Sequence, residues 1–600
     1  MPAQDPPRPR LVADLVVERL RAWGVRRVFG YSGDGINPVM GALRRADGDP
    51  AFVQARHEEN AALMASGHAK YTDGVGVVMS TQGPGAVHLL NGLYDAKLDH
   101  VPVVAIVGQQ ATSVLGSEYQ QEIDLTTLFK DVAAQFVQMV ATPEAAAMVL
   151  DRAFRTALAT RGPCVVVLPH DVQAAEAPEE PAHEHGVVPT TPAWRPPVVV
   201  PHDDDLREAA AVLDAGDRVA LLVGQGARHA EAEVRAVAER LGAGVTTSLL
   251  GKPWWDETAS TSCGVMGHLG TTASGWLLDS CDTLLIVGSN DPWTEFYPAP
   301  GQARAVQVDL DGRHLGNRYP IEVGLVGDAA TTLERLLPLL AERTDRAWEQ
   351  EVEREVQRWH DVADRRAALT PARLNPERVV RLLSAHVPAD AHVAVDVGSV
   401  TYWYARHLLL PRGVQAHLSS TLASMGSALP YGLAAKLATP DRPVVALLGD
   451  GAMQMNGLAE LVTVASRWQD WTDPRFVVLV LANEDLAEVT WEQRETEGDP
   501  RYDVSQSLPA VPYAGWAELL GLRGIRIDAP EQVDDAWRTA LSADRPVVIE
   551  AVVDRDVPLL PPFPGGAEKL GSFRDALGQE GATGKQARAL LDEHAAHEER

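Results

Sequence analysis

The sequence predicts an α/β protein built from three doubly wound domains, each with a parallel sheet. Short apolar runs bounded by glycine or proline alternate with helical periods along most of the chain, which is typical of buried parallel strands joined by helices. The composition changes twice, first to a proline-rich stretch and later to a highly charged one. The length of 600 residues is too great for a single hydrophobic core.

The first predicted domain occupies residues 11–175 and follows residues 1–10, which are rich in proline and charge and are expected to be disordered. Apolar runs place its strands at Val75–Met79, Val101–Val107 and Cys164–Leu168. Residues 176–205 include the segment EAPEEPAHEHGVVPTTPAWRPP. This composition predicts an extended linker.

The second predicted domain occupies residues 206–340, and the third occupies residues 375–555. Apolar runs place their strands at Val219–Val223, Thr283–Val287 and Ala305–Val308, and at Val393–Val395, Val444–Leu448, Phe476–Leu481 and Val547–Val553. Residues 341–374 are highly charged and have a helical period, so we expect a solvated linking helix. Residues 556–600 are rich in glycine, alanine and charge and are expected to be a C-terminal tail without a clear core.

Charge and cysteine content exclude several classes of protein. The formal net charge of −29 at pH 7 argues against nucleic-acid binding and against attachment to anionic lipid. Cys164, Cys263 and Cys281 are too few for a disulfide framework and lack metal-ligand spacing, which suits a reducing cytoplasm. The start, MPAQDPPRPR, has no apolar segment, and no run approaches the ~18 apolar residues of a membrane span. We therefore expect a cytoplasmic protein.

One informative segment lies where a predicted strand ends in the turn Gly449–Gly451, which reads GDG. A helix is expected to begin near Met455, and free N–H groups beside glycines favour a diphosphate. Asp450 is a hard oxygen ligand of the kind that Mg²⁺ prefers. The next predicted strand ends at Asn483, and adjacent parallel strands bring their carboxyl ends to one crevice. Asp450 and Asn483 are therefore candidate ligands of one cation, with an ordinary strand-to-helix turn as the alternative.

A second group of motifs lies in the first domain. Gln54–Lys70 reads QARHEENAALMASGHAK, so a carboxylate, Glu58, stands at the start of a helix of small residues. Ser80–Ala86 reads STQGPGA, and Asn91–Ile106 reads NGLYDAKLDHVPVVAI. Taken alone, Glu58 is a helix-start charge that interacts with the helix dipole.

Together these segments resemble the thiamine diphosphate enzymes of the pyruvate oxidase and acetolactate synthase group. The resemblance covers about residues 11–555 and rests on RHEE, GPG, GDG and the LAN turn, which occur in the family's order. The segments NGLYDAKLDHVPVVAIVGQ and VGQGARHA are most similar to the pyruvate oxidase branch. The resemblance implies a pyrimidine-binding first domain, a middle domain like those that bind FAD, and a third domain that binds the diphosphate and Mg²⁺.

The resemblance also implies roles for individual residues. Glu58 would hydrogen-bond the N1′ atom of the cofactor's aminopyrimidine and favour the tautomer that removes a proton from the thiazolium; Glu59 is its rival, but the family spacing selects Glu58. The Mg²⁺ ligands would be the side chains of Asp450 and Asn483 and the carbonyl of Asp485. The other residues implied at thiamine diphosphate are Gly398, Ser399, Val400, Ala423, Ser424, Met425, Gly449, Gly451, Ala452 and Leu486. Among these, Met425 would be the apolar wedge that bends the cofactor.

Two departures from the family pattern concern the third domain. The family usually has Asn-Asn at the end of this strand, whereas here Ala482 precedes Asn483, which keeps the metal ligand but removes a neighbouring hydrogen bond. Residues 452–481 form a slightly longer segment than usual, with Arg467–Arg475 as the expected insertion. Neither departure removes the implied cofactor site.

The middle domain carries a weaker signal, for a flavin. Val219–Val223 is followed by GQGARHA, and a GxG after a strand is also a common structural turn. By resemblance to the pyruvate oxidases, the residues that would line FAD are Gly224, Gly226, Arg228, Gly251, Gly270, Thr271, Asn290, Asp291, Asp309 and Asp328. The alternative is a domain that keeps this fold without the flavin.

The resemblance implies thiamine diphosphate- and Mg²⁺-dependent decarboxylation of a 2-oxo acid, with pyruvate the expected substrate, and electron transfer from the enamine to FAD. Gln121 matches a substrate-side glutamine of the oxidase branch, with a surface polar residue as the alternative. A first alternative function is an acetolactate synthase-type carboligase with structural or absent FAD; the segment around Trp491 favours it unless Trp491 is a core residue. A second is a non-catalytic binding or regulatory subunit, against which the presence of Glu58, Asp450 and Asn483 argues.

Partners follow from the same resemblance. In this family the pyrimidine and diphosphate residues at one cofactor come from different chains, which implies a homodimer or homotetramer. The lipid-activated quinone enzymes use an amphipathic C-terminal segment, but residues 565–600 have no sustained apolar stripe, so membrane contact is not expected. His57, His88 and His100 lie in matching segments without forming a metal set, and His88 is a candidate for facing the substrate.

Overall fold

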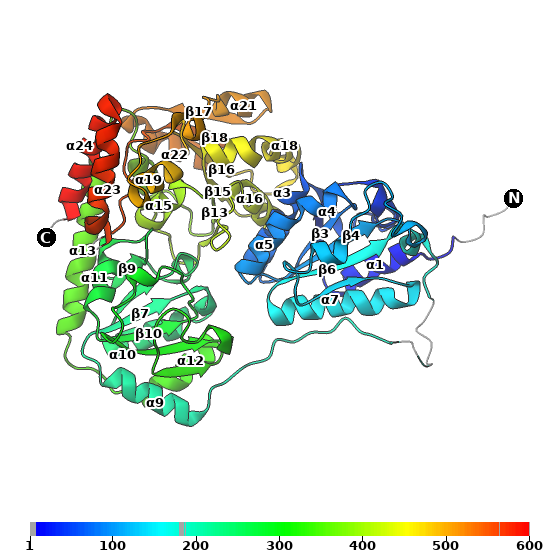
Figure 1. Ribbon diagram of the computed structural model, residues 1–600, viewed down its shortest axis with the longest axis horizontal. Helices are drawn as coiled ribbons and strands as arrows, with labels where there is room; N and C mark the ends of the chain where they lie inside the picture. The colour runs from blue at the N-terminus through cyan, green and yellow to red at the C-terminus, as the bar shows by residue number, and fades with distance from the viewer. Residues whose placement is uncertain (1–7, 179–184, 186–187, 563–564, 599–600) are drawn as a thin grey trace. The chain divides into compact units, whose positions relative to one another are not determined.

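The computed structural model describes residues 8–178, 185, 188–562 and 565–598. These residues form three six-stranded sheets with parallel strand pairs (Figure 1), so the prediction of three α/β domains with parallel sheets is confirmed. One compact unit contains the first sheet with residues 419–441 and 455–473, and the other contains the second and third sheets. Within the described residues, no helix combines the length and apolar character needed to cross a membrane.

The first sheet has the strand order β2-β1-β3-β4-β6-β5. Its strands are β1 (Arg27–Gly30), β2 (Ala51–Gln54), β3 (Gly76–Ser80), β4 (Val103–Gln109), β5 (Val137–Met139) and β6 (Pro163–Pro169). The helices of this segment are α1 (Val12–Ala22), α2 (Asn37–Arg45), α3 (Glu58–Thr72), α4 (Pro84–His88), α5 (Leu90–Leu98), α6 (Leu125–Leu128), α7 (Ala146–Thr160) and α8 (His170–Ala174). The strands β3, β4 and β6 are buried along their whole length, as apolar strands covered on both faces must be.

Two later helices complete this compact unit, α16 (Ala428–Ala438) and α18 (Leu458–Arg467). Helix α16 packs against α3, where a Cβ atom on Gly67 would lie 3.0 Å from the Tyr431 ring. The small residues of α3 therefore permit close helix packing.

The second sheet has the order β12-β11-β10-β7-β8-β9. Its strands are β7 (Val219–Val223), β8 (Gly244–Thr247), β9 (Ser262–Val265), β10 (Thr283–Val287), β11 (Arg304–Asp309) and β12 (Val323–Val326). The accompanying helices are α9 (Asp203–Asp214), α10 (Glu231–Leu241), α11 (Thr272–Ser280), α12 (Ala329–Leu336) and α13 (Ala347–Ala368). The order reverses between β7 and β10, which is where open sheets of this topology bind dinucleotides.

Helix α13 corrects the expectation of a solvated linking helix over residues 341–374. Trp348, Val352, Val356 and Trp359 lie along one face of it and join the core of the second sheet. The indole N–H of Trp348 donates to the carbonyl of Val219 at 2.9 Å. The charged residues occupy the remaining faces. The high charge content of the segment therefore did not reveal that one face of the helix is apolar.

The third sheet has the order β14-β13-β15-β16-β18-β17, the same pattern as the first. Its strands are β13 (His392–Val395), β14 (Gln415–His417), β15 (Val444–Gly449), β16 (Phe476–Ala482), β17 (Arg523–Ile527) and β18 (Val547–Val552). The helices of this segment are α14 (Pro376–Leu383), which precedes the sheet, and α15 (Ser399–His407), α17 (Asp450–Ala452), α19 (Ala487–Thr496), α20 (Asp503–Gln506), α21 (Tyr513–Leu519) and α22 (Val533–Leu541). Its order reverses between β13 and β15, whose carboxyl ends therefore border a ligand crevice.

The C-terminal residues form a helical hairpin, α23 (Gly565–Gln579) and α24 (Gly581–Glu598), drawn in orange to red in Figure 1. The expectation of a tail without a core is wrong, because Phe573, Leu577 and Leu591 are buried in the same core as the third sheet. A Cβ atom on Gly584 would lie 2.0 Å from the carbonyl oxygen of Leu577. The glycine and alanine content thus allows the two helices to approach closely.

The helix after the GDG turn also starts earlier than expected. It begins at Asp450 rather than near Met455, passes through a π-helical turn at Met453–Gly457 and continues as α18. Gly449 is extended and precedes the first helical residue, so the turn starts the helix directly. Residues 1–7 of the expected disordered N-terminus, and residues 179–184 and 186–187 of the expected linker, lie outside the described residues.

Candidate functional site

Two glycine turns border the crevice of the third sheet. Gly398 follows β13 with φ of +127°, a conformation that favours glycine, and Gly449 ends β15. Apart from the glycine and its two neighbours in the chain, no described residue has a heavy atom within 4 Å of the position that a Cβ atom would take on either glycine. The backbone of both turns is thus open to close approach, and Ser399 begins α15 directly after the first.

Asp450 is buried behind these turns, with 3% of its surface exposed. Its Oδ2 accepts hydrogen bonds from the backbone N–H of Asn483 (3.0 Å) and of Glu484 (2.6 Å), and its Oδ1 accepts one from Gly451 (3.0 Å). Burial raises the pKa of Asp450 to about 6, and the groups that oppose this shift are backbone N–H groups. A divalent cation would offset the cost of the buried charge, so the residue fits a hard metal ion.

The structure brings Asn483 and Asp485 to the same strand end as Asp450. The Asn483 Oδ1 accepts the backbone N–H of Asp485 at 2.9 Å. The carboxylate oxygens of Asp485 already have hydrogen-bond partners within the protein. They accept hydrogen bonds from Arg501 (2.7 and 2.9 Å) and from the Thr490 hydroxyl (2.8 Å). This leaves the backbone carbonyl of Asp485 as its candidate ligand.

A small hollow lies beside these groups, and Ser399, Asn483 and Ala487 are among its lining residues. The turn after β13 and the end of β16 therefore face one space.

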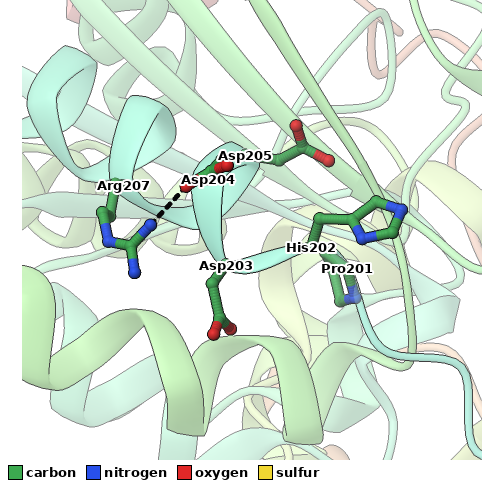
Figure 2. A pocket seen from close by; sticks show the side chains of 6 residues that line it. All are labelled: Pro201, His202, Asp203, Asp204, Asp205 and Arg207. Carbon is green, nitrogen blue, oxygen red and sulfur yellow. Dashed lines mark hydrogen bonds and ion pairs between the residues drawn. The ribbon is translucent and has the colours of Figure 1, made fainter.

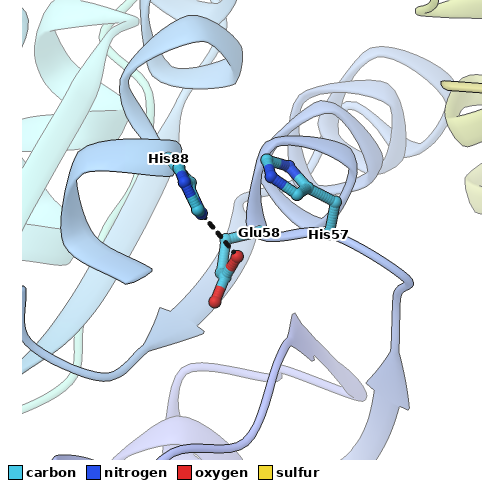
Figure 3. A group of neighbouring side chains, drawn as sticks. All are labelled: His57, Glu58 and His88. Carbon is cyan, nitrogen blue, oxygen red and sulfur yellow. Dashed lines mark hydrogen bonds and ion pairs between the residues drawn. The ribbon is translucent and has the colours of Figure 1, made fainter. Parts of the chain in front are cut away.

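Glu58 is the first residue of α3, and Figure 3 shows its neighbours. Its Oε2 lies 3.0 Å from Nδ1 of His88, and the rings of His57 and His88 are 4.4 Å apart. The ligand atoms of the three residues lie within 4.8 Å of one another. Two imidazoles and a carboxylate are a possible transition-metal ligand set, so these three side chains are close enough to hold an ion, and the expectation that His57 and His88 form no metal set stays a prediction. His100 is not part of this group.

The second carboxylate of the RHEE motif has different partners. The Glu59 Oε1 accepts hydrogen bonds from the side-chain amides of Asn91 (2.7 Å) and Asn456 (3.2 Å). Asn91 also donates to the Ser424 hydroxyl at 2.6 Å. Sequence reasoning missed these amides, although Asn91 opens the NGLYDA segment. Glu58 is thus paired with an imidazole, whereas Glu59 is held by two amides.

The loop that carries Ala423, Ser424 and Met425 is anchored within the same compact unit. The buried carboxylate of Asp99 accepts the backbone N–H groups of Ser420 (3.2 Å) and Thr421 (2.9 Å). The Lys70 ammonium donates to Asp99 at 2.7 Å. A buried ion pair therefore fixes the start of the loop that bears the candidate wedge.

Gln121 lies against the GPG turn. Its Oε1 accepts a hydrogen bond from the Gln82 amide at 3.1 Å, and a Cβ atom on Gly83 would lie 2.8 Å from the Cβ of Gln121. On the other side of the turn, a Cβ atom on Gly85 would lie 3.3 Å from Oε1 of Glu58. Gln121 and Glu58 thus both border the GPG turn, and Gln121 is exposed.

The flavin candidates of the middle domain fall into two groups. The first group has structural partners within the protein: Gly224 and Gly226 pack on Gly288, Gly251 on Val223, Gly270 on Val265, Thr271 and Asp328 cap helices, and Asp309 accepts the backbone N–H of Asp311. Arg228 follows these turns, just after Ala227.

The second group follows β10, at the reversal of strand order. The Asn290 Oδ1 and the Ser289 hydroxyl are buried without a hydrogen-bond partner among the described residues, and burial raises the pKa of the neighbouring Asp291 to about 7. Unpartnered buried polar atoms fit a ligand that carries hydroxyl and amide groups.

Trp491 is a core residue. It is 1% exposed, its ring lies 5.7 Å from that of Phe573, and its indole N–H donates to the carbonyl of Arg555 at 3.2 Å. The alternative in which Trp491 shapes an acceptor pocket loses its structural basis.

Sequence reasoning also did not identify Glu488 as a carboxyl group with a raised pKa. This residue lies one helical turn before Glu492 on α19. Burial, with repulsion from Glu492, raises the pKa of Glu488 to about 8. Two acidic residues spaced i, i+4 directly after the Asn483–Asp485 turn were the available signal.

A second hollow lies at the start of α9 (Figure 2) and is lined by Pro201, His202, Asp203, Asp204, Asp205 and Arg207. Arg207 pairs with Asp204, and three carboxylates in a first helical turn stabilise the helix dipole. These acidic residues are explained by the start of the helix.

Comparison with known proteins agrees with this arrangement. Residues 10–128 match the N-terminal TPP binding domain of thiamine pyrophosphate enzymes, residues 206–336 their central domain and residues 396–551 their C-terminal TPP binding domain. A thiamine pyrophosphate-containing protein of Bacillus subtilis is 34% identical over 556 residues, which cover 93% of each chain.

Two further relatives bear names that specify an activity. Pyruvate oxidase of Lactiplantibacillus plantarum is 29% identical over 92% of this chain and 89% of its own. The large subunit of acetolactate synthase isozyme 2 of Escherichia coli is 33% identical over 93% of this chain and 99% of its own. The chain therefore belongs to the thiamine pyrophosphate enzymes of the pyruvate oxidase and acetolactate synthase family.

Proposed function

We propose that the protein is a thiamine diphosphate- and Mg²⁺-dependent enzyme that decarboxylates a 2-oxo acid, with pyruvate as the substrate and FAD as the electron acceptor. When bound, thiamine diphosphate supplies an electron sink for the cleaved carbon–carbon bond, and FAD supplies a two-electron acceptor. The observation that carries the proposal is the buried Asp450 carboxylate, held by backbone N–H groups at the point where the strand order reverses.

The residues of the third domain would hold the diphosphate and its metal ion. Asp450, Asn483 and the carbonyl of Asp485 would bind Mg²⁺. The open glycine turns at Gly398 and Gly449 would let the diphosphate lie against the backbone, with the N–H groups at the start of α15 directed to an anion.

The first domain would supply the groups that take part in proton transfer at the aminopyrimidine. Glu58 would hydrogen-bond the aminopyrimidine, and His88 would hold the other side of its carboxylate. Gln121, beyond the GPG turn, would contact the 2-oxo acid, and Met425 would support the bent cofactor. Self-association would supply residues from two chains to one site, as the family resemblance implies.

The oxidase is favoured over the carboligase by the position of Trp491. Its burial against Phe573 supports the interpretation of Trp491 as a core residue, which was the alternative to an acceptor pocket. The strand order of the second sheet supports a flavin, and so does the Asn290 Oδ1, which has no hydrogen-bond partner among the residues that the structure describes. Asn290, Asp291 and Arg228 are the residues best suited to hold it.

One experiment tests the proposal. The purified protein, supplied with thiamine diphosphate, Mg²⁺ and FAD and passed through a desalting column, is examined by visible absorption before and after anaerobic addition of pyruvate. The proposal expects retained yellow colour that bleaches with release of CO₂. Retained colour that does not bleach, together with acetolactate, would identify the carboligase. A colourless protein without CO₂ release would identify a non-catalytic subunit.

A further inference from the structure

The C-terminal hairpin packs on the helix that follows the candidate metal turn. Helix α23 contacts α19, and α19 begins two residues after Asp485. Trp491 of α19 faces Phe573 of α23, and both side chains are buried. The hairpin therefore supports the segment that leads out of the Asn483–Asp485 turn.

Glu580, between the two helices of the hairpin, is the polar centre of this contact. Its two carboxylate oxygens accept a bidentate pair of hydrogen bonds from the Arg494 guanidinium, both at 2.8 Å. The side chains are 8% and 2% exposed, and the guanidinium also lies 4.5 Å from the Trp491 ring. A buried bidentate pair of this kind fixes both position and orientation.

The Glu580 carboxylate also contacts the segment that follows α19. The Glu580 Oε1 accepts the backbone N–H of Arg501 at 2.9 Å. Arg501 in turn donates through Nε and Nη2 to Oδ1 of Asp485, at 2.9 and 2.7 Å, and also to the Ser507 hydroxyl at 2.8 Å. Glu580 thus binds the backbone of Arg501, and the side chain of Arg501 binds Asp485 in the candidate metal turn.

Arg501 lies between α19 and α20, in a segment without regular structure. Such a segment has no helical hydrogen bonds to fix it, so its position depends on contacts of this kind. The Asp485 side chain is 1% exposed and depends on Arg501 for its charge partner. The Arg501 side chain also pairs with Asp503, but its backbone N–H is held by Glu580. Loss of the Glu580 contact would therefore loosen the backbone of Arg501 and, through it, the contact with Asp485.

We propose that Glu580 is a positioning residue through which the C-terminal hairpin orders the Asn483–Asp485 turn for cation binding. The inference rests on the proposed function to the extent that this turn holds Mg²⁺. The order of the turn can be measured without any cofactor.

The test compares Glu580→Gln, which keeps the size of the side chain, with Asp592→Asn as the matched control. Asp592 lies on the same hairpin in an ion pair with Arg574 in which both side chains are more than 40% exposed. Hydrogen exchange of residues 483–508 is followed in the cofactor-free protein. Binding of thiamine diphosphate at fixed Mg²⁺ is measured by titration calorimetry.

We expect Glu580→Gln to accelerate exchange at residues 483–508 and to weaken thiamine diphosphate binding roughly 10-fold, the usual scale for a partner that acts through a ligand. Asp592→Asn should change neither quantity. Unchanged exchange at these residues in Glu580→Gln would overturn the inference. A wild-type protein that binds no thiamine diphosphate would contradict the proposed function, and the exchange measurement would still decide the role of Glu580.

A second variant distinguishes a specific effect on the turn from a general disruption of the hairpin. Arg501→Lys replaces the two donors to Oδ1 of Asp485 with a single donor and leaves the Arg494–Glu580 pair intact. It should loosen residues 483–508 while exchange over residues 565–598 stays at the wild-type level. Protection of the turn equal to the wild type in this variant would also overturn the inference.

Discussion

The imidazole Nδ1 of His88 lies 3.0 Å from Oε2 of Glu58. The two residues come from different helices, since His88 ends α4 and Glu58 begins α3. Gly85 of α4 lies beside the same carboxylate, since a Cβ atom on Gly85 would lie 3.3 Å from Oε1 of Glu58. The carboxylate expected to meet the aminopyrimidine is thus oriented from the side by the helix of the GPG motif.

This contact predicts a defined defect in His88→Gln. The variant loses a hydrogen bond to a carboxylate, so the rate of pyruvate decarboxylation should fall roughly tenfold. Thiamine diphosphate affinity should stay close to the wild-type value, because the diphosphate anchor is untouched. His170→Gln, at the exposed start of α8, serves as the control. Equal decarboxylation rates in His88→Gln and the wild type would remove His88 from the site.

The two carboxylates of the RHEE motif, Glu58 and Glu59, should respond differently to the same substitution. We expect Glu58→Gln to lower decarboxylation by about 100-fold or more, because a positioned proton-transfer group contributes on that scale. Glu59→Gln keeps the size of a side chain that accepts hydrogen bonds from two amides, so its main effect should be a lower melting temperature. Steady-state assays and thermal denaturation check both. The reverse ranking of the two rates would assign the catalytic role to Glu59.

The metal site makes a binding prediction. Asp450→Ala should abolish Mg²⁺-dependent retention of thiamine diphosphate, since it removes the buried charge that faces the cation. Asp470→Ala, a change just after α18 at an exposed position, should retain the cofactor normally. Cofactor that stays with both proteins through gel filtration in Mg²⁺ would contradict the metal assignment.

The sequence predicted most of the inner strands of each sheet and placed Asp450 and Asn483 at neighbouring strand ends, for physical reasons. Buried parallel strands are continuous apolar runs, so Val444–Leu448 and Phe476–Leu481 lie within strands β15 and β16. Asp450 and Asn483 follow those runs directly, and pairing of Gly449 with Leu481 brings them together. A strand end is fixed by its own strand, so its residues can be located from local pattern alone.

Contacts between distant segments could not be predicted in this way. The partnership of His88 with Glu58 depends on the packing of two helices, and that of Glu580 with Arg494 on a hairpin whose small residues resembled a tail. In α13 the apolar face is interrupted by many charges, so Trp348 was hidden by composition. These features depend on tertiary structure, which local periodicity does not encode.

His68 predicts how the stability of the first domain depends on pH. Burial, with a contribution from Arg27, lowers the pKa of His68 to about 4, whereas an unfolded histidine has a pKa of about 6.5. Between these values the unfolded chain binds a proton that the folded chain does not, so stability falls as pH falls from 6.5 towards 4. The full effect is up to about 3 kcal/mol.

His68→Phe should lack this component. Its melting temperature should therefore decline less than that of the wild type between pH 7 and pH 5. Parallel melting curves for the two proteins across this range would show that His68 does not titrate as its burial requires.

Mixing two inactive variants tests whether the site is shared between chains. If Glu58 of one chain and Asp450 of another serve one cofactor, a dimer of Glu58→Gln with Asp450→Ala contains one intact site and one doubly altered site. Random reassortment of the two variants should then restore about one quarter of the wild-type decarboxylation rate, because half of the dimers are mixed and each has one intact site of two. If each chain builds its own site, every site carries one defect and no activity returns. Assays after unfolding and refolding the two variants together, compared with each variant refolded alone, separate these outcomes, and a mixture as inactive as its components would contradict a shared site.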